Sequence, residues 1–263
     1  MHRRAPALPR TALLTGVGRR RGIGAAIARG LAEDGCDLAL SFHGEYDRRV
    51  LGEDADVELL AEELRGLGRR VVLLPGDLTD ADFCRRLVED AVEGLGGLDA
   101  LVNNAGRQIA VESLEEIDDQ QWEDTYAVNI HAMFRITQAA LKHLPAGSTI
   151  VNSTSIQAYE PSPTLVDYAS TKAAINNFTK GLAQQLAPRG IRVNAVAPGP
   201  IWTPLQVSDG QPKEALPEFG KSTPLGRAGQ PTELAPAYVF LTSSESSYVL
   251  GETLAVTGGS PTP

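Results

Sequence analysis

The sequence predicts an α/β fold built on one doubly wound parallel sheet of about seven strands, with helices on both faces. Short apolar runs alternate with longer segments of helical periodicity along the whole chain, which is typical of repeated strand–helix units. Several apolar runs are uninterrupted, as expected for parallel strands that are covered on both faces. No change of composition marks a linker, so we expect residues 1–263 to form a single domain.

The predicted strands are short runs of aliphatic and β-branched residues bounded by turn residues. They are Ala12–Thr15, Leu38–Ser41, Arg70–Leu74, Ala100–Asn103, Thr149–Ser153, Arg192–Ala197 and Thr253–Val256. The predicted helices between them carry apolar residues at helical spacing. They are Ile23–Glu33, Val57–Leu67, Ala81–Leu95, Gln120–Leu144, Tyr168–Ala187 and Thr232–Thr242. Because proline lacks an amide donor and crowds the preceding turn, we expect the last helix to start late or to bend at Pro236.

One long segment has no regular period. Residues 198–230 are rich in proline and glycine. A stretch of this length without secondary structure is usually disordered or functional in a compact domain. We therefore predict that residues 198–230 form a substrate-binding loop or lid.

Composition excludes several classes of protein. The net charge of −9 is opposite in sign to that of a nucleic-acid binder. Cys36 and Cys84 stand far apart with no histidine cluster nearby, so we expect no metal site and thiols of a reducing cytoplasm. No run of about 18 apolar residues occurs, which argues against a membrane protein. We expect a cytoplasmic protein that binds a small molecule.

Glycines cluster between the first predicted strand and the first predicted helix. A β-carbon at such a turn would keep the backbone away from a pyrophosphate, and the free amides of the helix start favour phosphate charge. A plain tight turn is the alternative, but the place between strand and helix favours a dinucleotide site. The predicted contact residues are Gly16, Gly18, Gly22, Ile23 and Gly24.

Two features favour NADP over NAD. The second predicted strand ends in Ser41, Phe42 and His43, without the acidic residue that usually binds the ribose hydroxyls of NAD. The glycine turn carries three consecutive arginines, whose forked guanidinium groups suit a 2′-phosphate. We predict that Ser41 and one or more of these arginines hold that phosphate, although arginines that are merely solvated would look the same. The arginines are Arg19, Arg20 and Arg21.

A tyrosine and a lysine open the fifth predicted helix. Tyr168 and Lys172 stand four residues apart, so they share one helical face. A nearby ammonium favours the phenolate and lowers a tyrosine pKa, which suits a general acid for carbonyl reduction. Ser155 follows the fifth predicted strand, where ligands bind to parallel sheets, and its hydroxyl can hydrogen-bond a substrate oxygen. A serine that simply caps a loop is the alternative.

The order of these motifs resembles the short-chain dehydrogenase/reductase (SDR) family, and within it the 3-oxoacyl carrier-protein reductases. The resemblance covers nearly the whole chain. It departs at the turn, where five residues rather than three lie between Gly16 and Gly22. The matching segments are the glycine turn, Asn103 to Gly106, Ser155, Tyr168 with Lys172, Pro198 with Gly199, and Gly251 to Val256.

The resemblance implies roles for these and further residues. Tyr168 would be the general acid/base, Lys172 would lower its pKa and bind the nicotinamide ribose, and Ser155 would orient the carbonyl. Asn129 is similar to an asparagine that holds a water between Lys172 and solvent. Asp77 would contact adenine, or else cap the following helix. The other implied cofactor contacts are Leu78, Asn103, Asn104, Ala105, Gly106, Pro198, Gly199, Ile201 and Thr203.

The family implies an NADP(H)-dependent oxidoreductase that reversibly reduces a ketone or aldehyde. A 3-oxoacyl thioester reductase shares all of this chemistry, and a non-catalytic NADP-binding sensor is the alternative from another class. An enoyl reductase is disfavoured, because its tyrosine and lysine usually stand farther apart. The resemblance also implies a homotetramer formed through the two longest predicted helices and the last strand. Candidates for the substrate pocket are Arg107, Gln108, Gln157, Tyr159, Trp202 and Phe219.

Overall fold

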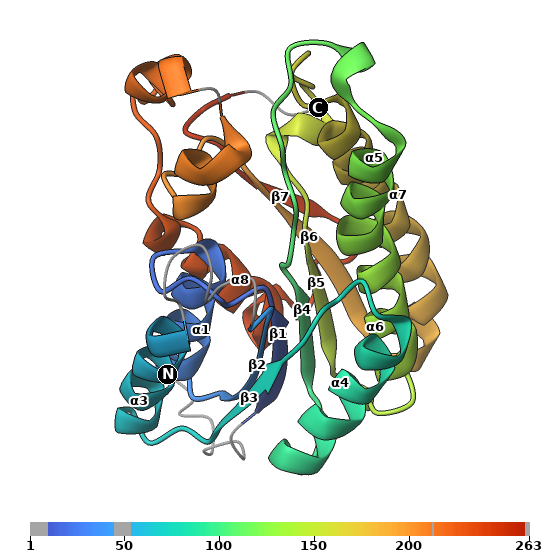
Figure 1. The fold of residues 1–263 in the computed structure, drawn as a ribbon. Coiled ribbons are helices and arrows are strands. Elements are labelled where there is room, and N and C mark those ends of the chain that lie inside the picture. The colour runs from blue at the N-terminus through green and yellow to red at the C-terminus, as the bar shows by residue number, and fades with distance from the viewer. Residues whose placement is uncertain (1–9, 45–53, 212, 261–263) are drawn as a thin grey trace.

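The computed structural model describes residues 10–44, 54–211 and 213–260. In these ranges it contains one sheet of seven parallel strands in the order β3-β2-β1-β4-β5-β6-β7, with helices on both faces (Figure 1). The strands are β1 Thr11–Thr15, β2 Asp37–Phe42, β3 Val71–Pro75, β4 Ala100–Asn103, β5 Thr149–Ser153, β6 Arg192–Pro198 and β7 Thr253–Val256. The predicted fold class is confirmed, and every predicted strand begins and ends within one residue of these bounds.

Two helical layers cover the sheet, and the burial that they provide explains the uninterrupted apolar strands. One layer contains α1 Ile23–Glu33, α3 Asp54–Gly66 and α8 Ala235–Thr242, and the other contains α4 Ala81–Leu95, α5 Asp119–Tyr126, α6 Met133–Ala140 and α7 Val166–Leu186 (Figure 1). Successive residues of β1 face opposite layers. Leu14 belongs to a cluster with Ile27 of α1, whereas Leu13 belongs to a cluster with Leu87 of α4 and Leu182 of α7.

The prediction of one unbroken helix over residues 120–144 is wrong. α5 is followed by a π-helical segment, Ala127–Ala132, before α6 begins, and α6 ends at Ala140. A π turn inserts an extra residue into the helix, and the spacing of apolar residues does not reveal this irregularity. Such segments occur frequently at functional sites. This one carries Asn129.

The last helix starts late, as its proline predicts. A 3₁₀ turn, Pro231–Glu233, precedes α8, and Pro236 lies in the first turn of α8, where its missing amide has no helical partner to lose. The segment 198–230 also contains short helices. They are a π-helical turn at Gln206–Gly210 and a 3₁₀ helix at Lys213–Glu218.

The strand order reverses beside β1. The chain proceeds from β1 through β2 to β3, and then returns to place β4 on the other side of β1. Ligands of open α/β sheets bind beyond the carboxyl ends of the strands at such a reversal. Gly16, Asn104 and Thr154 directly follow β1, β4 and β5, so the reversal brings the predicted motifs together.

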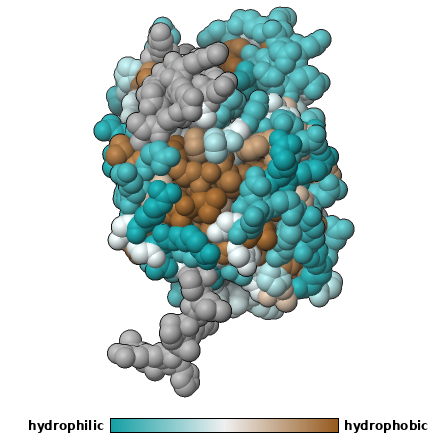
Figure 2. Space-filling model, turned by 60° about the horizontal axis from the view of Figure 1, so that its bottom comes forward, coloured by the Kyte–Doolittle hydropathy of each residue, from teal (hydrophilic) through white to brown (hydrophobic). Residues whose placement is uncertain are grey.

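The surface is largely polar, with an apolar area on the side that Figure 2 brings forward. Strand β3 forms one edge of the sheet, and three of its residues, Val72, Leu73 and Leu74, are only partly buried. Its length of five residues limits pairing with other chains.

Within residues 10–44, 54–211 and 213–260, no helix has both the length and the apolar character needed to cross a membrane.

Candidate active site

A cleft of about 570 Å³ lies at the carboxyl end of the sheet. This volume is typical of small-molecule sites. Three of the four predicted catalytic residues line it, namely Ser155, Tyr168 and Lys172. Most of the predicted cofactor contacts line it as well. They are Gly16, Gly18, Arg19, Gly22, Ile23, Gly24, Asp77, Leu78, Asn104, Ala105, Gly106, Pro198, Gly199, Ile201 and Thr203.

The glycine turn is packed so tightly that side chains do not fit. Gly16 has φ +76°, and a β-carbon on it would lie 2.6 Å from the Cα atom of Ala105. A β-carbon on Gly24 would lie 2.3 Å from the carbonyl oxygen of Gly16. The amide of Val17 donates to the carbonyl of Ser41, 3.0 Å away, and so ties the turn to β2. The bare backbone of the turn therefore faces the cleft at the start of α1.

Only one of the three turn arginines faces the cleft. Arg19 lines it, and its Nη1 lies 3.5 Å from the hydroxyl of Ser208. Arg20 points to Glu63, with 3.8 Å between Nη2 and Oε2. Arg21 is exposed and, like Arg20, is outside the described lining of the cleft. Of the three arginines, Arg19 is therefore the one that a ligand in the cleft could contact.

Ser41 differs from its predicted position. Its side chain is fully buried in β2, and its hydroxyl has no hydrogen-bond partner among the described residues. Phe42 and His43 line the cleft at the tip of β2 instead. His43 Nε2 lies 3.8 Å from Oδ2 of Asp77, which follows β3. Arg19, Phe42, His43 and Asp77 form what we call the phosphate end of the cleft.

The turn after β4 is held by side-chain hydrogen bonds. Asn104 Nδ2 donates to the carbonyls of Thr15 and Gly16, both at 3.1 Å, and the Thr15 hydroxyl accepts from the amides of Asn104 and Ala105. Asn103 instead directs its amide into the protein, toward Asn152. Of these two asparagines, only Asn104 is among the described residues that line the cleft.

Asp77 does not cap helix α4. Its Oδ1 accepts from the amide of Thr79, at 2.8 Å, and so stabilises the turn that precedes the helix. The N-cap of α4 is Asp80, which accepts from the amide of Asp82. Asp77 is therefore not engaged as the helix cap, and it lines the cleft.

Ser155 combines both of the interpretations that its position allows. Its hydroxyl accepts from the amide of Gln157, 3.2 Å away, and caps the 3₁₀ turn Ile156–Ala158. The side chain is buried and also lines the cleft. The cap fixes the position of the hydroxyl on the cleft wall.

Tyr168 and Lys172 share one face of α7, one turn apart. Lys172 Nζ lies 5.2 Å from the centroid of the Tyr168 ring. The ammonium donates to the carbonyl of Ser153 at 2.9 Å, which fixes it against the end of β5. Tyr168 is half-buried and Lys172 is buried. We call Ser155, Tyr168 and Lys172, with the end of β5, the catalytic end of the cleft.

The protein groups alone do not give Tyr168 the near-neutral pKa that a neighbouring cation suggests. Burial raises the pKa of Tyr168 to about 12, while the Ser155 hydroxyl acts in the opposite direction. Burial also lowers the pKa of Lys172 to about 8. Both shifts have one cause, because a poorly solvated environment disfavours the charged form of each group. Near pH 7 the tyrosine is therefore a phenol and the lysine largely an ammonium.

Asn129 is fixed in the π-helical segment by protein contacts. Its Oδ1 accepts from the amide of Arg107 at 2.7 Å, and its Nδ2 donates to the Arg107 carbonyl and to the Thr171 hydroxyl, both at 3.0 Å. Thr171 directly precedes Lys172 on α7. Asn129 thus joins the loop after β4 to the helix that carries Tyr168 and Lys172.

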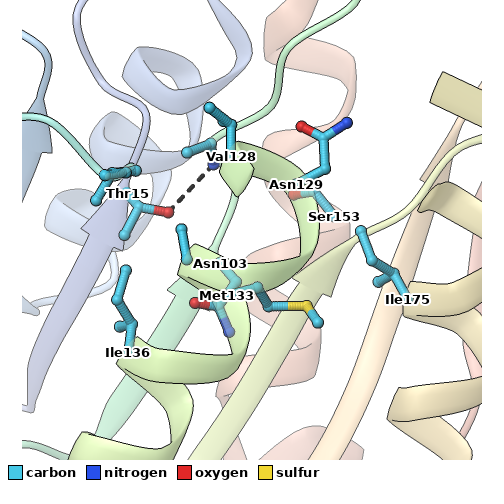
Figure 3. Close-up of a pocket in the computed structure, with 11 residues that line it drawn as sticks. Thr15, Asn103, Val128, Asn129, Met133, Ile136, Ser153 and Ile175 are labelled. Atoms are coloured by element: carbon cyan, nitrogen blue, oxygen red, sulfur yellow. Dashed lines mark hydrogen bonds between the residues drawn. The ribbon is translucent and has the colours of Figure 1, made fainter. Parts of the chain in front are cut away.

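A small cavity of about 10 Å³, drawn in Figure 3, shares the lining residues Val128 and Ser153 with the cleft. Asn129 and Ser153 line it together with Thr15, whose hydroxyl is drawn in Figure 3 with the bond that it accepts. Asn103 also lines it, and its Oδ1 has no partner among the described residues. This volume is close to the minimum for one water molecule. The expected association of Asn129 with a water stays a prediction.

The substrate candidates divide into two groups. Arg107, Gln108, Gln157 and Phe219 line the cleft, whereas Trp202 and Tyr159 are outside its described lining. Trp202 packs against Phe219, with ring centroids 5.9 Å apart. Sequence reasoning missed further lining residues, because no motif identifies them and only the fold brings them to the cleft. Polar examples are Asp124, Gln206, Ser208 and Tyr238.

Comparison with known proteins agrees with this geometry. A family model described as enoyl-(acyl carrier protein) reductase matches residues 16–260. The uncharacterized oxidoreductase YghA of Escherichia coli is 51% identical over 251 residues, which are 95% of this chain and 82% of that protein. Two plant proteins are 41% identical over 95% of this chain. They are glucose and ribitol dehydrogenase of Daucus carota, 84% covered, and NADPH-dependent aldehyde reductase 1 of Arabidopsis thaliana, 85% covered.

Solved structures match over nearly the full length. A short-chain dehydrogenase from Burkholderia cenocepacia in complex with NADP has a TM-score of 0.85 and 33% identity, with 95% of this chain and 97% of that chain covered. A blue fluorescent protein from a metagenomic library, in complex with NADPH, has a TM-score of 0.85 and 35% identity, with the same coverage. The fold of this chain is therefore similar to that of two proteins solved in complex with NADP or NADPH.

Proposed function

This chain belongs to the short-chain dehydrogenase/reductase family of oxidoreductases, and we propose that it is an NADP(H)-dependent enzyme that reduces aldehydes or ketones reversibly. The observation that carries the proposal is the catalytic end of the cleft. A phenol, an ammonium and a hydroxyl, from Tyr168, Lys172 and Ser155, line one cleft with a bare glycine turn. This arrangement combines a proton donor with a dinucleotide site.

The residues present fit a dinucleotide. Four glycines of the turn, Gly16, Gly18, Gly22 and Gly24, line the cleft without side chains that would keep a phosphate away from the backbone. It leads into the N-terminus of α1, a helix of 11 residues, whose free amides and dipole favour pyrophosphate. Asn104 to Gly106 would flank the nicotinamide half, and Asp77 and Leu78 the adenine half.

Preference for NADP is supported by the phosphate end. Arg19 provides a forked cation in the cleft wall. Phe42 and His43, neither of them acidic, line the cleft at the end of β2. NADP and NADPH occupy the two similar solved structures, and the Arabidopsis relative is named for NADPH. Arg19 is our candidate for the 2′-phosphate contact.

The catalytic end supplies the proton chemistry. When bound, NADPH supplies the hydride that reduces the carbonyl carbon. Ser155 donates a hydrogen bond that orients the carbonyl oxygen. Tyr168 gives its proton to that oxygen as negative charge develops, and its raised pKa keeps it protonated beforehand. Lys172, 5.2 Å from the ring centroid, then stabilises the phenolate by its charge.

The cleft wall around the substrate carries polar side chains. Arg107 pairs with Asp124, with 3.3 Å between Nη2 and Oδ2, and Gln108 and Gln157 lie in the same wall. Such groups suit a small polar aldehyde or ketone. The names of the two plant relatives, an aldehyde reductase and a glucose and ribitol dehydrogenase, support this class. Phe219 brings the segment 198–230 to the cleft, which supports its role as the substrate loop.

A homotetramer in the cytoplasm completes the proposal. Apolar side chains are exposed on the helices expected to form one interface, with Trp122 on α5, Phe134 on α6 and Val166 on α7. Leu254 of the edge strand β7 is exposed at the other expected interface. Exposed apolar residues of this kind mark association surfaces where they adjoin.

The proposal is tested by following NADPH oxidation with a panel of substrates. The panel contains short aldehydes, glucose, a cyclic ketone, a 3-oxoacyl thioester and an enoyl thioester, each assayed with NADPH and with NADH. We expect turnover of aldehydes or ketones and a higher kcat/KM with NADPH. Turnover of the 3-oxoacyl thioester alone would support that reductase instead. Tight NADPH binding without turnover of any panel member would favour a sensor.

A further inference from the structure

We propose that Tyr238 of α8 is a positioning residue, whose buried hydroxyl fixes the end of β5 and thereby the ammonium of Lys172. This inference rests on the proposed function, and it concerns a residue outside the catalytic motifs. Tyr238 is fully buried at the floor of the cleft. Its hydroxyl oxygen lies 2.6 Å from Oγ of Ser153, the last residue of β5.

The hydroxyl of Tyr238 begins a chain of side-chain hydrogen bonds. Ser153 Oγ donates to Oδ1 of Asn104, 3.4 Å away. Asn104 Nδ2 in turn donates to the carbonyls of Thr15 and Gly16. The chain therefore runs from the C-terminal helix through β5 and the turn after β4 to the glycine turn. It connects four segments that are distant in sequence and that all border the cleft.

Asn104 Oδ1, which accepts from Ser153, fixes which hydroxyl donates to which in this chain. An amide oxygen can only accept, so the single hydroxyl proton of Ser153 goes to Asn104. Tyr238 must then donate to Ser153. Burial raises the pKa of Tyr238, the Ser153 hydrogen bond lowers it, and a negative charge on Tyr168 raises it further. The Tyr238 hydroxyl therefore stays protonated and remains a donor when Tyr168 becomes a phenolate.

Ser153 is also the residue that holds Lys172. Its carbonyl accepts from Lys172 Nζ at 2.9 Å, while its hydroxyl is held by Tyr238. A shift of Ser153 would move the ammonium relative to the ring of Tyr168. Misplacing a catalytic group by about 1 Å can reduce the rate even when the substituted residue does not touch the reacting atoms. Tyr238 thus acts on the proton donor through two intermediates.

Packing alone does not account for a tyrosine at this position. The ring of Tyr238 belongs to an apolar cluster with Leu14, Ile27 and Leu241, and a phenylalanine would fill the same volume. A buried hydroxyl carries a desolvation cost unless it is hydrogen-bonded. The hydroxyl is therefore the part of the side chain that requires a functional explanation.

The test compares Tyr238→Phe with Tyr248→Phe, which removes the same hydroxyl from a fully exposed ring. We expect Tyr238→Phe to lower kcat of reduction about five-fold, the effect of one buried hydrogen bond on a rate, and to weaken NADPH binding measured by fluorescence. In alcohol oxidation, the pH of half-maximal kcat should move upward, because a displaced ammonium supports the phenolate less. Tyr248→Phe should match the wild type in all three measurements.

A second variant tests the route through Ser153. Ser153→Ala keeps the carbonyl that holds Lys172 but removes the hydroxyl. If Tyr238 acts through that hydroxyl, adding Tyr238→Phe to Ser153→Ala should change kcat little further. Additive losses, or an unchanged pH profile in Tyr238→Phe, overturn the inference while wild-type turnover leaves the proposed function intact. If the wild type reduces no panel member, the proposed function fails, and unchanged NADPH affinity in Tyr238→Phe then refutes the inference separately.

Discussion

The two ends of the cleft are built differently. At the catalytic end, Ser155 and Lys172 are buried, and each is bonded to backbone of the same fold. At the phosphate end, the side chain of His43 is 44% exposed, and Nη1 of Arg19 lies 3.5 Å from the hydroxyl of Ser208. We therefore expect the fold itself to determine the geometry of the proposed reaction, and a few side chains at the phosphate end to determine which dinucleotide is preferred. Substitutions at the catalytic end should therefore lower kcat strongly, whereas substitutions at the phosphate end should change cofactor affinity moderately.

The catalytic end also carries a cost in stability. Lys172 is an ammonium buried with one hydrogen-bond partner, and burial lowers its pKa to about 8. The folded protein therefore holds this charge less readily than the unfolded chain does. Functional sites commonly sacrifice stability in this way.

The largest effect is expected at the proton donor. Tyr168→Phe removes the hydroxyl but keeps the ring that Lys172 faces, so kcat should fall by about 10² to 10⁴, the usual contribution of a general acid. NADPH affinity should change little, because the glycine turn and Arg19 are untouched. Steady-state kinetics and fluorescence titration measure the two quantities. Turnover close to that of the wild type would remove the assignment and, with it, the contrast between the two ends.

The next prediction separates activity from stability at the same end. In Lys172→Met, a chain of similar length fills the site without charge, so kcat should fall, though by less than in Tyr168→Phe. The lysine of the wild type has a pKa lowered from 10.5 to about 8. Between these values the unfolded chain binds more protons than the folded one, so wild-type stability gains with rising pH, and the variant lacks this gain.

The stability difference between Lys172→Met and the wild type should therefore shift with pH. From about pH 7 to about pH 9.5, it should move in favour of the wild type by roughly 2 kcal/mol. Urea unfolding of both proteins at the two pH values measures the shift, and comparing the two proteins cancels the other titrating groups. If the difference in the free energy of unfolding is the same at both pH values, burial does not lower the pKa of Lys172. The catalytic end then carries no stability cost that distinguishes it from the phosphate end.

The fold could be predicted because its signals are local. Short apolar runs bounded by turn residues located all seven strands, and Pro236 correctly predicted the late start of α8. The π-helical segment at Ala127–Ala132 could not be predicted, because it preserves the apolar spacing on both sides while adding one residue to a turn. Its position depends on bonds from Asn129 to Arg107 and Thr171, which lie on other segments.

Part of the candidate site could also be predicted from the sequence. Ser155, Tyr168 and Lys172 follow strand ends and helical spacing, which sequence displays directly. Ser41 was expected at the cofactor, but helices cover both faces of β2 and bury it, and Phe42 and His43 line the cleft. No sequence motif includes Tyr238, and the sequence alone indicates only a core residue of α8. Its contact with Ser153 spans 85 positions of the chain, and only the folded sheet creates it.

The smallest expected effect lies at the phosphate end and sharpens the contrast. Arg19→Ala should weaken NADPH binding about ten-fold, the loss of one charge-assisted hydrogen bond, while NADH binding stays the same because NADH lacks the 2′-phosphate. Arg21→Ala removes an equal charge two residues away from an exposed position outside the described cleft lining, and should leave both affinities unchanged. Fluorescence titration of the two variants with both dinucleotides decides the matter. Equal losses in the two variants would show that charge in general attracts the cofactor, whereas a loss confined to Arg19→Ala would show that a single side chain selects it. In either case kcat at saturating NADPH should persist, because the catalytic end is built from other segments.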